Sequence, residues 1–298
     1  MASSSPCNVL QANLHQQTFQ LRRWLEVNST ALVLIQEPWV RQGRICGLPN
    51  TRGKLIQFTG PESSRSCIFI TNNLLAQPLT EFCSRDICAI TLLDTTTHQP
   101  KMVVASVYMP DEDSPPHEEL AKLLSHCESA NLELLVATDC NGYHPLWGMQ
   151  FRNERGRQLV EYLFPSNLNI LNVGSEPTFV TRRCKTIVDI TLATEGVSNI
   201  ISIWHVSREA SCSDNRWIRF NIEVNTNNPS PGRKPRKTNP ALKTMMESRL
   251  KEVVFPERLV GIDNIKKQVT CVHDAIVTCY HAACPPTTPP SGKPKAQS

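Results

Sequence analysis

Residues 132–142 read Leu-Glu-Leu-Leu-Val-Ala-Thr-Asp-Cys-Asn-Gly, so a β-rich apolar run ends abruptly in an acid and an amide. A continuous apolar run of this length is typical of a strand in a sheet that is covered on both faces. Because loops at strand ends often carry functional side chains, Asp139 and Asn141 are the first candidates for a site. A similar polar string, Ser213-Asp214-Asn215, lies beside the apolar run 217–224.

The rest of the first 225 residues follows the same pattern of short β-rich runs with few helices. Apolar residues at i, i+3, i+4 and i+7 predict a helix over 120–127, with Ser114 and Pro115 as its N-cap and first-turn proline. The same spacing predicts a helix over 156–163 after Asn153, and a third helix is expected over 16–27. The pattern indicates an α+β domain whose active edge is built from loops. The expected strands are 8–14, 31–36, 55–58, 67–71, 87–93, 102–108, 132–138, 187–193, 200–206 and 217–224.

A basic, proline-rich stretch over 226–240 marks a domain boundary. We therefore expect one domain over 1–225, a linker over 226–240, a helical segment over 241–284 and a disordered tail over 285–298. Apolar residues three and four apart give the helix 259–283 a single apolar seam, which predicts that it packs on a partner.

Charge divides along the same boundary. Residues 226–298 contain 12 lysines and arginines against 5 acidic residues, whereas residues 1–225 contain 19 against 22. The mildly acidic body suits a carboxylate-lined metal site, and the basic C-terminal part suits a polyanion. No run approaches the roughly 20 apolar residues that span a bilayer, and no secretory signal precedes the domain, so we expect an intracellular protein without a membrane partner.

Oxygen-bearing side chains stand at several strand ends. Mg²⁺ prefers hard oxygen ligands, usually one or two carboxylates completed by water and substrate phosphate. Glu37, Asp139 with Asn141, and Asp214 offer such oxygens from distant points of the sequence. Taken alone, each of these residues is as well explained by a turn or a helix cap.

The order of these motifs is more specific than any one of them. Along the chain come Asn13, Gln36-Glu37-Pro38, Tyr108-Met109-Pro110, Asp139-Cys140-Asn141, Asp189 and Ser213-Asp214-Asn215. This order resembles the endonuclease/exonuclease/phosphatase superfamily. Within it, Asn-Gly-Tyr-His-Pro-Leu-Trp-Gly at 141–148 and Arg-Trp-Ile at 216–218 make the chain most similar to the apurinic-type endonuclease domain of jockey-like non-LTR retrotransposons. The resemblance covers about residues 7–224.

The resemblance implies a four-layered α/β sandwich, two packed β-sheets flanked by helices, here with a C-terminal helical extension. It implies a Mg²⁺ cofactor, for which Mn²⁺ could substitute, and DNA as the substrate. The implied reaction nicks DNA in the nucleus and leaves a 3′-hydroxyl. That hydroxyl would prime DNA synthesis by a reverse transcriptase domain of a longer polyprotein. The implied roles are metal binding for Glu37 and Asp214; phosphate and water positioning for Asn13, Asn141 and Tyr108; alignment of the nucleophile for Asp139; and orientation of the catalytic histidine for Asp189. His144, Arg182 and Arg183 are expected to contact DNA.

Position 215 departs from that pattern, because Asn215 stands where the superfamily has histidine. An amide neither accepts a proton at neutral pH nor becomes a cation. Loss of a general acid or base typically costs about 10² to 10⁴-fold in rate. We therefore expect a preserved site with weakened cleavage.

Other functions remain open at this stage: an inactive DNA-binding relative or decayed element copy, and a phosphatase-type member of the same superfamily. A solvated loop explains Arg182 and Arg183 as well as a DNA contact does. Trp39 and Trp147 suit either core packing or stacking on bases.

Overall fold

The computed structural model describes residues 5–28, 31–48, 53–209, 211–224, 244, 246–249 and 262–283. The chain divides into two compact units, residues 1–227 and 228–298. The predicted linker over 226–240 and the predicted tail over 285–298 lie outside the described residues.

The first unit contains two six-stranded sheets of similar design. Each has a central parallel pair, β1 with β2 and β9 with β10, and its other neighbours are antiparallel. The first sheet runs β15 (Ile201–Val206), β16 (Ile218–Val224), β1 (Ser5–Asn13), β2 (Ala31–Gln36), β6 (Ser66–Thr71) and β5 (Gly53–Gln57). The second runs β11 (Asn169–Ile170), β14 (Asp189–Ala193), β10 (Leu134–Asp139), β9 (Pro100–Tyr108), β8 (Ile87–Leu93) and β7 (Leu75–Pro78).

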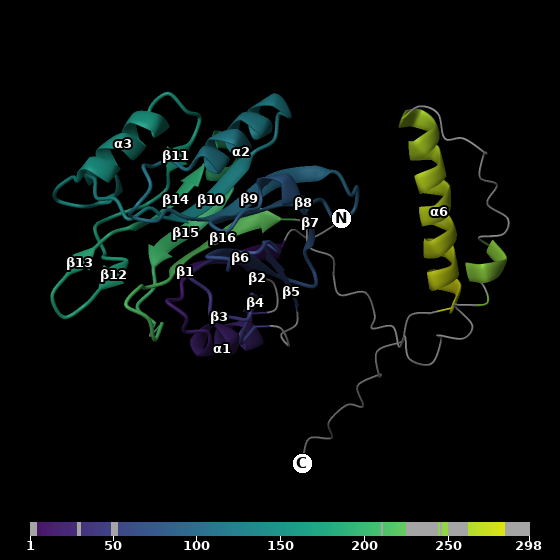
Figure 1. The fold of residues 1–298 in the computed structure, drawn as a ribbon, viewed down its shortest axis with the longest axis horizontal. Helices are drawn as coiled ribbons and strands as arrows, with labels where there is room; N and C mark the ends of the chain where they lie inside the picture. The colour runs from purple at the N-terminus through teal and green to yellow at the C-terminus, as the bar shows by residue number, and fades with distance from the viewer. Residues whose placement is uncertain are drawn as a thin grey trace, which may run out of the picture. The chain divides into compact units, whose positions relative to one another are not determined.

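The two sheets pack face to face between outer helices (Figure 1). Alternation along β9 shows how one strand serves two cores: Val104 packs between the sheets, whereas Val103 and Ala105 face the helices on the other side. Helices α2 (Glu118–Ser129) and α3 (Glu154–Leu163) cover the second sheet, and α1 (Phe19–Val27) covers the first. The expected four-layered α+β sandwich is confirmed.

A buried polar layer joins the two sheets near the end of β10. The Gln11 side-chain amide donates to the carbonyl oxygens of Thr138 and Ile190, at 3.2 and 3.1 Å. The Gln36 amide donates to the Ser106 hydroxyl at 2.9 Å and to a β10 carbonyl. Because an unpaired buried amide costs free energy, these bonds fix how the sheets align where Asp139 leaves β10.

Two hairpins and short helical turns complete the unit: β3 (Val40–Arg41) with β4 (Arg44–Ile45), and β12 (Phe179–Val180) with β13 (Lys185–Thr186). The turns are η1 (Thr80–Phe82), η2 (Pro145–Trp147) and α4 (Glu195–Ser198). The second unit contains α6 (Ile262–Ala283), the predicted helical extension. On α6, Val269 and Ile276 are exposed, and none of the described helices is long and apolar enough to cross a bilayer.

Of the two predicted helix N-caps, one is confirmed and the other is wrong. Asn153 caps α3, its side-chain oxygen accepting from the Gly156 N–H at 2.8 Å, as predicted. The helix predicted over 120–127 is present as α2, but its predicted N-cap was wrong, because the helix begins at Glu118 and its N-cap position is His117. A residue before proline disfavours the helical region, so Ser114 and Pro115, each followed by proline, stay outside the helix.

Candidate active site

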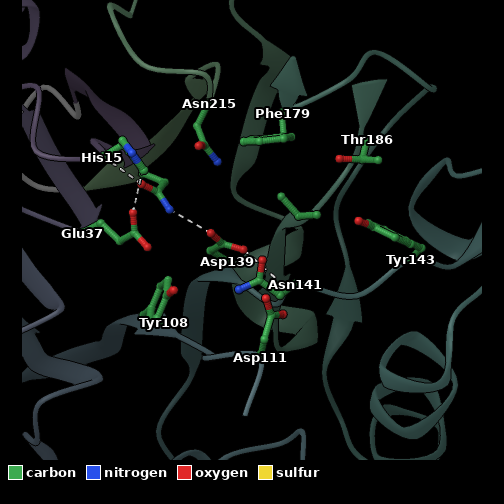
Figure 2. Close-up of a pocket in the computed structure, with 12 residues that line it drawn as sticks. His15, Glu37, Tyr108, Asp111, Asp139, Asn141, Tyr143, Phe179, Thr186 and Asn215 are labelled. Carbon is green, nitrogen blue, oxygen red and sulfur yellow. Dashed lines mark hydrogen bonds and ion pairs between the residues drawn. The ribbon is translucent and has the colours of Figure 1, made fainter. Parts of the chain in front are cut away.

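The site forms where the central parallel pairs of both sheets end at one edge. Glu37 follows β2, while Tyr108 and Asp139 end β9 and β10 as register partners. Asn13 ends β1, and its side-chain amide donates to Asp139 Oδ2 across the two sheets at 2.8 Å. Figure 2 shows the Glu37, Tyr108 and Asp139 side chains close together. Packing of one sheet on the other thus brings together residues that lie 126 positions apart.

These strand ends surround a cleft of about 160 Å³. Six residues predicted for the site line it: Asn13, Glu37, Tyr108, Asp139, Asn141 and Asn215. Six that the sequence analysis missed also line it: His15, Asp111, Tyr143, Phe179, Thr186 and Val188. His15 and Asp111 lie two and three positions after predicted site residues, so an extension of each strand-end motif would have included them.

Several cleft residues have an unusual backbone. His15, Glu37 and Asn141 have φ of 41°, 48° and 48°, in the left-handed region that costs free energy for most residues other than glycine, although less for asparagine. Hydrogen bonds hold these conformations: the Glu37 N–H donates to the Arg65 carbonyl at 2.9 Å, and the Asn141 amide donates to the Met109 carbonyl at 3.1 Å. Such strain persists only where the surrounding structure enforces it, and it clusters at functional sites.

Negative charge is concentrated in and behind the cleft. Burial raises the pKa of Asp139 well above its usual value, and the nearby Asp189 carboxylate adds to the rise. Burial and the Glu37 carboxylate raise the pKa of Tyr108, so its hydroxyl stays protonated and can donate to an anion. These carboxyl groups disfavour one another's charge, and a bound cation would relieve that repulsion.

Arg65 holds the Tyr108 ring in place. Its guanidinium lies over the ring, 4.9 Å from the centroid, and forms a two-pronged ion pair with Asp86, with an Nη2 to Oδ2 distance of 2.7 Å. The Tyr108 N–H donates to the Asp86 carbonyl at 2.8 Å. The Tyr108 hydroxyl is thereby aimed by a side chain that no motif in the sequence singled out.

Asn215 sits where it can reach Asp189. Its side-chain amide donates to Asp189 Oδ2 at 3.2 Å, and only 4% of the residue is exposed. The other carboxylate oxygen of Asp189, Oδ1, is buried without a hydrogen-bond partner. The position thus has the buried acid and the geometry of a proton-transfer pair, but its amide cannot take a proton.

The structure does not bring every predicted residue into the cleft. The carbonyl of Asp214 accepts from the Val180 N–H at 2.8 Å, and the next residue, Asn215, bridges to Phe179. Asn215 is buried and lines the cleft, whereas Asp214, in the bend just before it, is exposed and lies outside the cleft lining.

The remaining predicted contacts lie around the cleft. His144 caps η2, its Nδ1 accepting from the Leu146 N–H at 3.2 Å, and it does not line the cleft. Arg182 and Arg183 are exposed in the turn of the β12–β13 hairpin, which projects at one end of the sandwich (Figure 1). Trp147 is buried in the core, whereas Trp39 is 42% exposed near Glu37.

The donors in the cleft fit a hard divalent cation. Carboxylates from Glu37 and Asp139 and amide oxygens from two asparagines are ligand types that Mg²⁺ accepts, with water and phosphate completing its shell. Within the part of the chain that the structure describes, no three His, Cys, Asp or Glu side chains cluster closely enough to hold a metal alone.

Comparison with known proteins defines the class of the fold. The model of the family described as endonuclease-reverse transcriptase matches residues 102–219. An AP endonuclease from Archaeoglobus fulgidus is 12% identical, with a TM-score of 0.50, and the match covers 73% of this chain and 100% of the endonuclease chain. A 3′-5′ exonuclease from Neisseria meningitidis is 13% identical, with a TM-score of 0.53, and the match covers 72% of this chain and 99% of the exonuclease chain. The chain has the endonuclease/exonuclease/phosphatase fold.

A more similar structure is the endonuclease domain of TRAS1, a telomere-specific non-LTR retrotransposon. The two are 25% identical with a TM-score of 0.61, and the match covers 74% of this chain and 99% of that domain. The resemblance to endonuclease domains of non-LTR retrotransposons is therefore confirmed. No curated protein matches the sequence significantly.

Proposed function

We propose that this chain is the DNA endonuclease part of a non-LTR retrotransposon protein, and that its cleavage is weakened by Asn215. The observation that carries the proposal is the convergence of Glu37, Asp139 and Tyr108 on one cleft at the joint edge of two sheets. A reverse transcriptase domain elsewhere in a longer polyprotein is the partner proposed to use the nick, and the nucleus is the place proposed for the reaction.

The proposed reaction adds water to a backbone phosphorus and breaks the bond to the 3′ oxygen, leaving a 3′-hydroxyl and a 5′-phosphate. Mg²⁺ or Mn²⁺ bound beside Glu37 would supply charge neutralisation at the phosphate. The Asn13 and Asn141 amides and the protonated Tyr108 hydroxyl position the phosphate oxygens. Asp139 aligns the water and would take the proton that the water loses, and the 3′ oxygen would take a proton from solvent as its bond to phosphorus breaks.

Asn215 limits this reaction. A histidine at position 215 would become a cation beside the buried Asp189 carboxylate, stabilising the charge that builds on the phosphate. The amide instead donates to Asp189 and stays neutral. The site therefore retains its substrate-positioning groups without its strongest charge-stabilising group.

A plasmid-nicking assay tests the proposal. Supercoiled DNA and Mg²⁺ are incubated with the chain as it stands and with Asn215→His, and nicked circles are counted over time. We expect the variant to nick about 10² to 10⁴-fold faster. Adding Asp139→Ala to Asn215→His should abolish the gain; nicking that survives this second change would overturn the assigned site.

An inactive DNA-binding relative is the second candidate, and Asn215 itself favours it. If Asn215→His binds duplex DNA as the parent does yet nicks no faster, this reading replaces the first. Hydrolysis of a phosphate monoester without nicking would instead favour a phosphatase-type activity.

A further inference from the structure

One imidazole faces the cleft without a role in the mechanism above. His15 follows Asn13 by two residues, at the end of β1, and lines the cleft beside Glu37 (Figure 2). Its Nδ1 lies 3.2 Å from Glu37 Oε2. The His15 side chain is 72% exposed, so its position is not enforced by burial.

The backbone fixes the placement of both partners. His15 and Glu37 each adopt left-handed φ, and the next residue, Gln16, also does so at 68°. The Gln16 N–H donates to the Glu37 carbonyl at 3.0 Å, and the His15 N–H donates to Asn13 Oδ1 at 2.9 Å. Two strained strand-end loops are thus tied together so that the imidazole and the carboxylate meet over the cleft.

The donor separation has a specific chemical meaning. Two ligands about 2.1 Å from one ion and at right angles to each other stand about 3 Å apart in octahedral geometry. His15 Nδ1 and Glu37 Oε2 form a hydrogen-bond contact in the structure, and their separation of 3.2 Å is also close to that value. A ring nitrogen with access to solvent can also turn toward an ion while Glu37 keeps its place.

We propose that His15 supplies an imidazole ligand to the divalent cation beside Glu37, giving a mixed nitrogen and oxygen site that favours Mn²⁺ over Mg²⁺. The proposal rests on the proposed metal-dependent function and specifies its metal. Imidazole nitrogen adds affinity for transition ions, whereas Mg²⁺ takes oxygen ligands and keeps its water. An all-oxygen site at Glu37 would lack that preference.

Electron spin echo spectroscopy of bound Mn²⁺ tests this assignment directly. With Mn²⁺ at less than one equivalent and no DNA present, the full chain should show nitrogen modulation from a coordinated imidazole. His15→Asn should lose the modulation, because asparagine tolerates the left-handed backbone but has no ring nitrogen. His98→Asn is the matched control, since His98 is also exposed and also has positive φ, 60°, and should keep the modulation.

Calorimetric titration supplies the second readout. We expect His15→Asn to weaken Mn²⁺ binding about tenfold and to leave Mg²⁺ binding within about twofold of the parent. Equal weakening of both ions would mean that His15 only orients Glu37, and would overturn the proposal. Thermal unfolding midpoints of the two asparagine variants check that both remain folded.

Failure of this proposal is distinguishable from failure of the function it rests on. Suppose that Mn²⁺ binds to the parent, that Glu37→Gln abolishes this binding, and that no nitrogen modulation is seen. In that case His15 is not a ligand, but the metal site at Glu37 is still supported. If Mn²⁺ binding is unchanged by Glu37→Gln, the metal site itself is wrongly placed and both proposals fall.

Discussion

At the scale of single residues, the cleft combines groups that cost stability with groups that prepare chemistry. Asp139 and Asp189 are register partners on β10 and β14, both almost fully buried, and each carries an acid where burial disfavours charge. Hydrogen bonds offset part of that cost: the Asn13 amide and the Asn141 N–H donate to Asp139, and the Asn215 amide donates to Asp189. Such a site is expected to lower the stability of the fold in exchange for a prepared electrostatic environment.

The titration of Asp189 gives a stability prediction. Burial raises its pKa to about 6, above the value near 4 of the unfolded chain. The folded state therefore holds an extra proton between about pH 4 and pH 6, and the free energy of unfolding should fall as the pH rises through that window. Asp189→Asn, which keeps an oxygen for Asn215, should remove the part of this fall that Asp189 contributes, leaving the part due to Asp139, and should stabilise the fold at pH 8 by about 1–3 kcal/mol.

Urea unfolding without added metal, at pH 5 and pH 8, measures this effect. Glu195→Gln, at the exposed start of α4, is a control that changes an acid outside the cleft. If the free energy of unfolding depends on pH in the same way for the parent and for Asp189→Asn, then Asp189 is already charged in the folded state at pH 5.

At the scale of elements, loops between regular elements carry most of the site. The β12–β13 hairpin pairs with residue 215 through Phe179 and presents Arg182 and Arg183 in its exposed turn. The loop after β10 is fixed at Tyr143, whose N–H donates to the Asn153 side chain at 2.8 Å. The loop after β10 is thus held at both Asn141 and Tyr143, whereas the hairpin is anchored at Phe179 and exposes its turn.

The hairpin gives a binding prediction. Replacing Arg182 and Arg183 by glutamine should weaken duplex DNA binding, because two cations near the cleft no longer release counterions from phosphates. The slope of log affinity against log salt should fall in magnitude by up to about 2. Fluorescence anisotropy from 50 to 200 mM salt measures it, with the exposed neighbours Arg22→Gln and Arg23→Gln on α1 as the paired control. Equal loss from both pairs would assign the effect to net charge.

The cap of α3 gives a prediction that links an element to the site. Asn153 Oδ1 accepts from the N–H groups of both Gly156 and Tyr143, each at 2.8 Å. Asn153→Ala should cost about 1–2 kcal/mol of unfolding free energy and loosen the Tyr143 loop. Asn153→Asp keeps the acceptor and should cost less than half as much in urea unfolding. Equal losses would show that the amide nitrogen, and not the oxygen, is what matters.

At the scale of the whole molecule, the chain divides into two compact units, residues 1–227 and 228–298. The TRAS1 endonuclease domain is covered over 99% of its length by 74% of this chain, which indicates that the first unit contains a complete fold of this class. The apolar seam predicted on α6, with exposed Val269 and Ile276, remains a prediction of a partner surface.

Truncation tests the independence of the first unit. A fragment of residues 1–227 should unfold in one cooperative transition, because both sheets and their helices lie within it. Carrying Asn215→His, it should nick plasmid DNA within about threefold of the full variant chain. A much lower rate, with unchanged thermal unfolding, would assign a DNA-binding role to residues 228–298.

The sequence by itself determined the ten longer strands, because their apolar runs must be buried, and it determined the polar motifs that end several of them. It did not predict the short strands β3, β4, β7, β11, β12 and β13. Asn153 predicted the start of its helix, because an N-cap bonds to a residue only three positions away. Only the tertiary structure decided that His15 and Arg65 belong beside the cleft and that the Asp214 side chain does not. Those outcomes depend on how the two sheets align and on how the bridge between Phe179 and Asn215 orients the segment around residue 215. Neither is encoded in the local sequence pattern of any one segment.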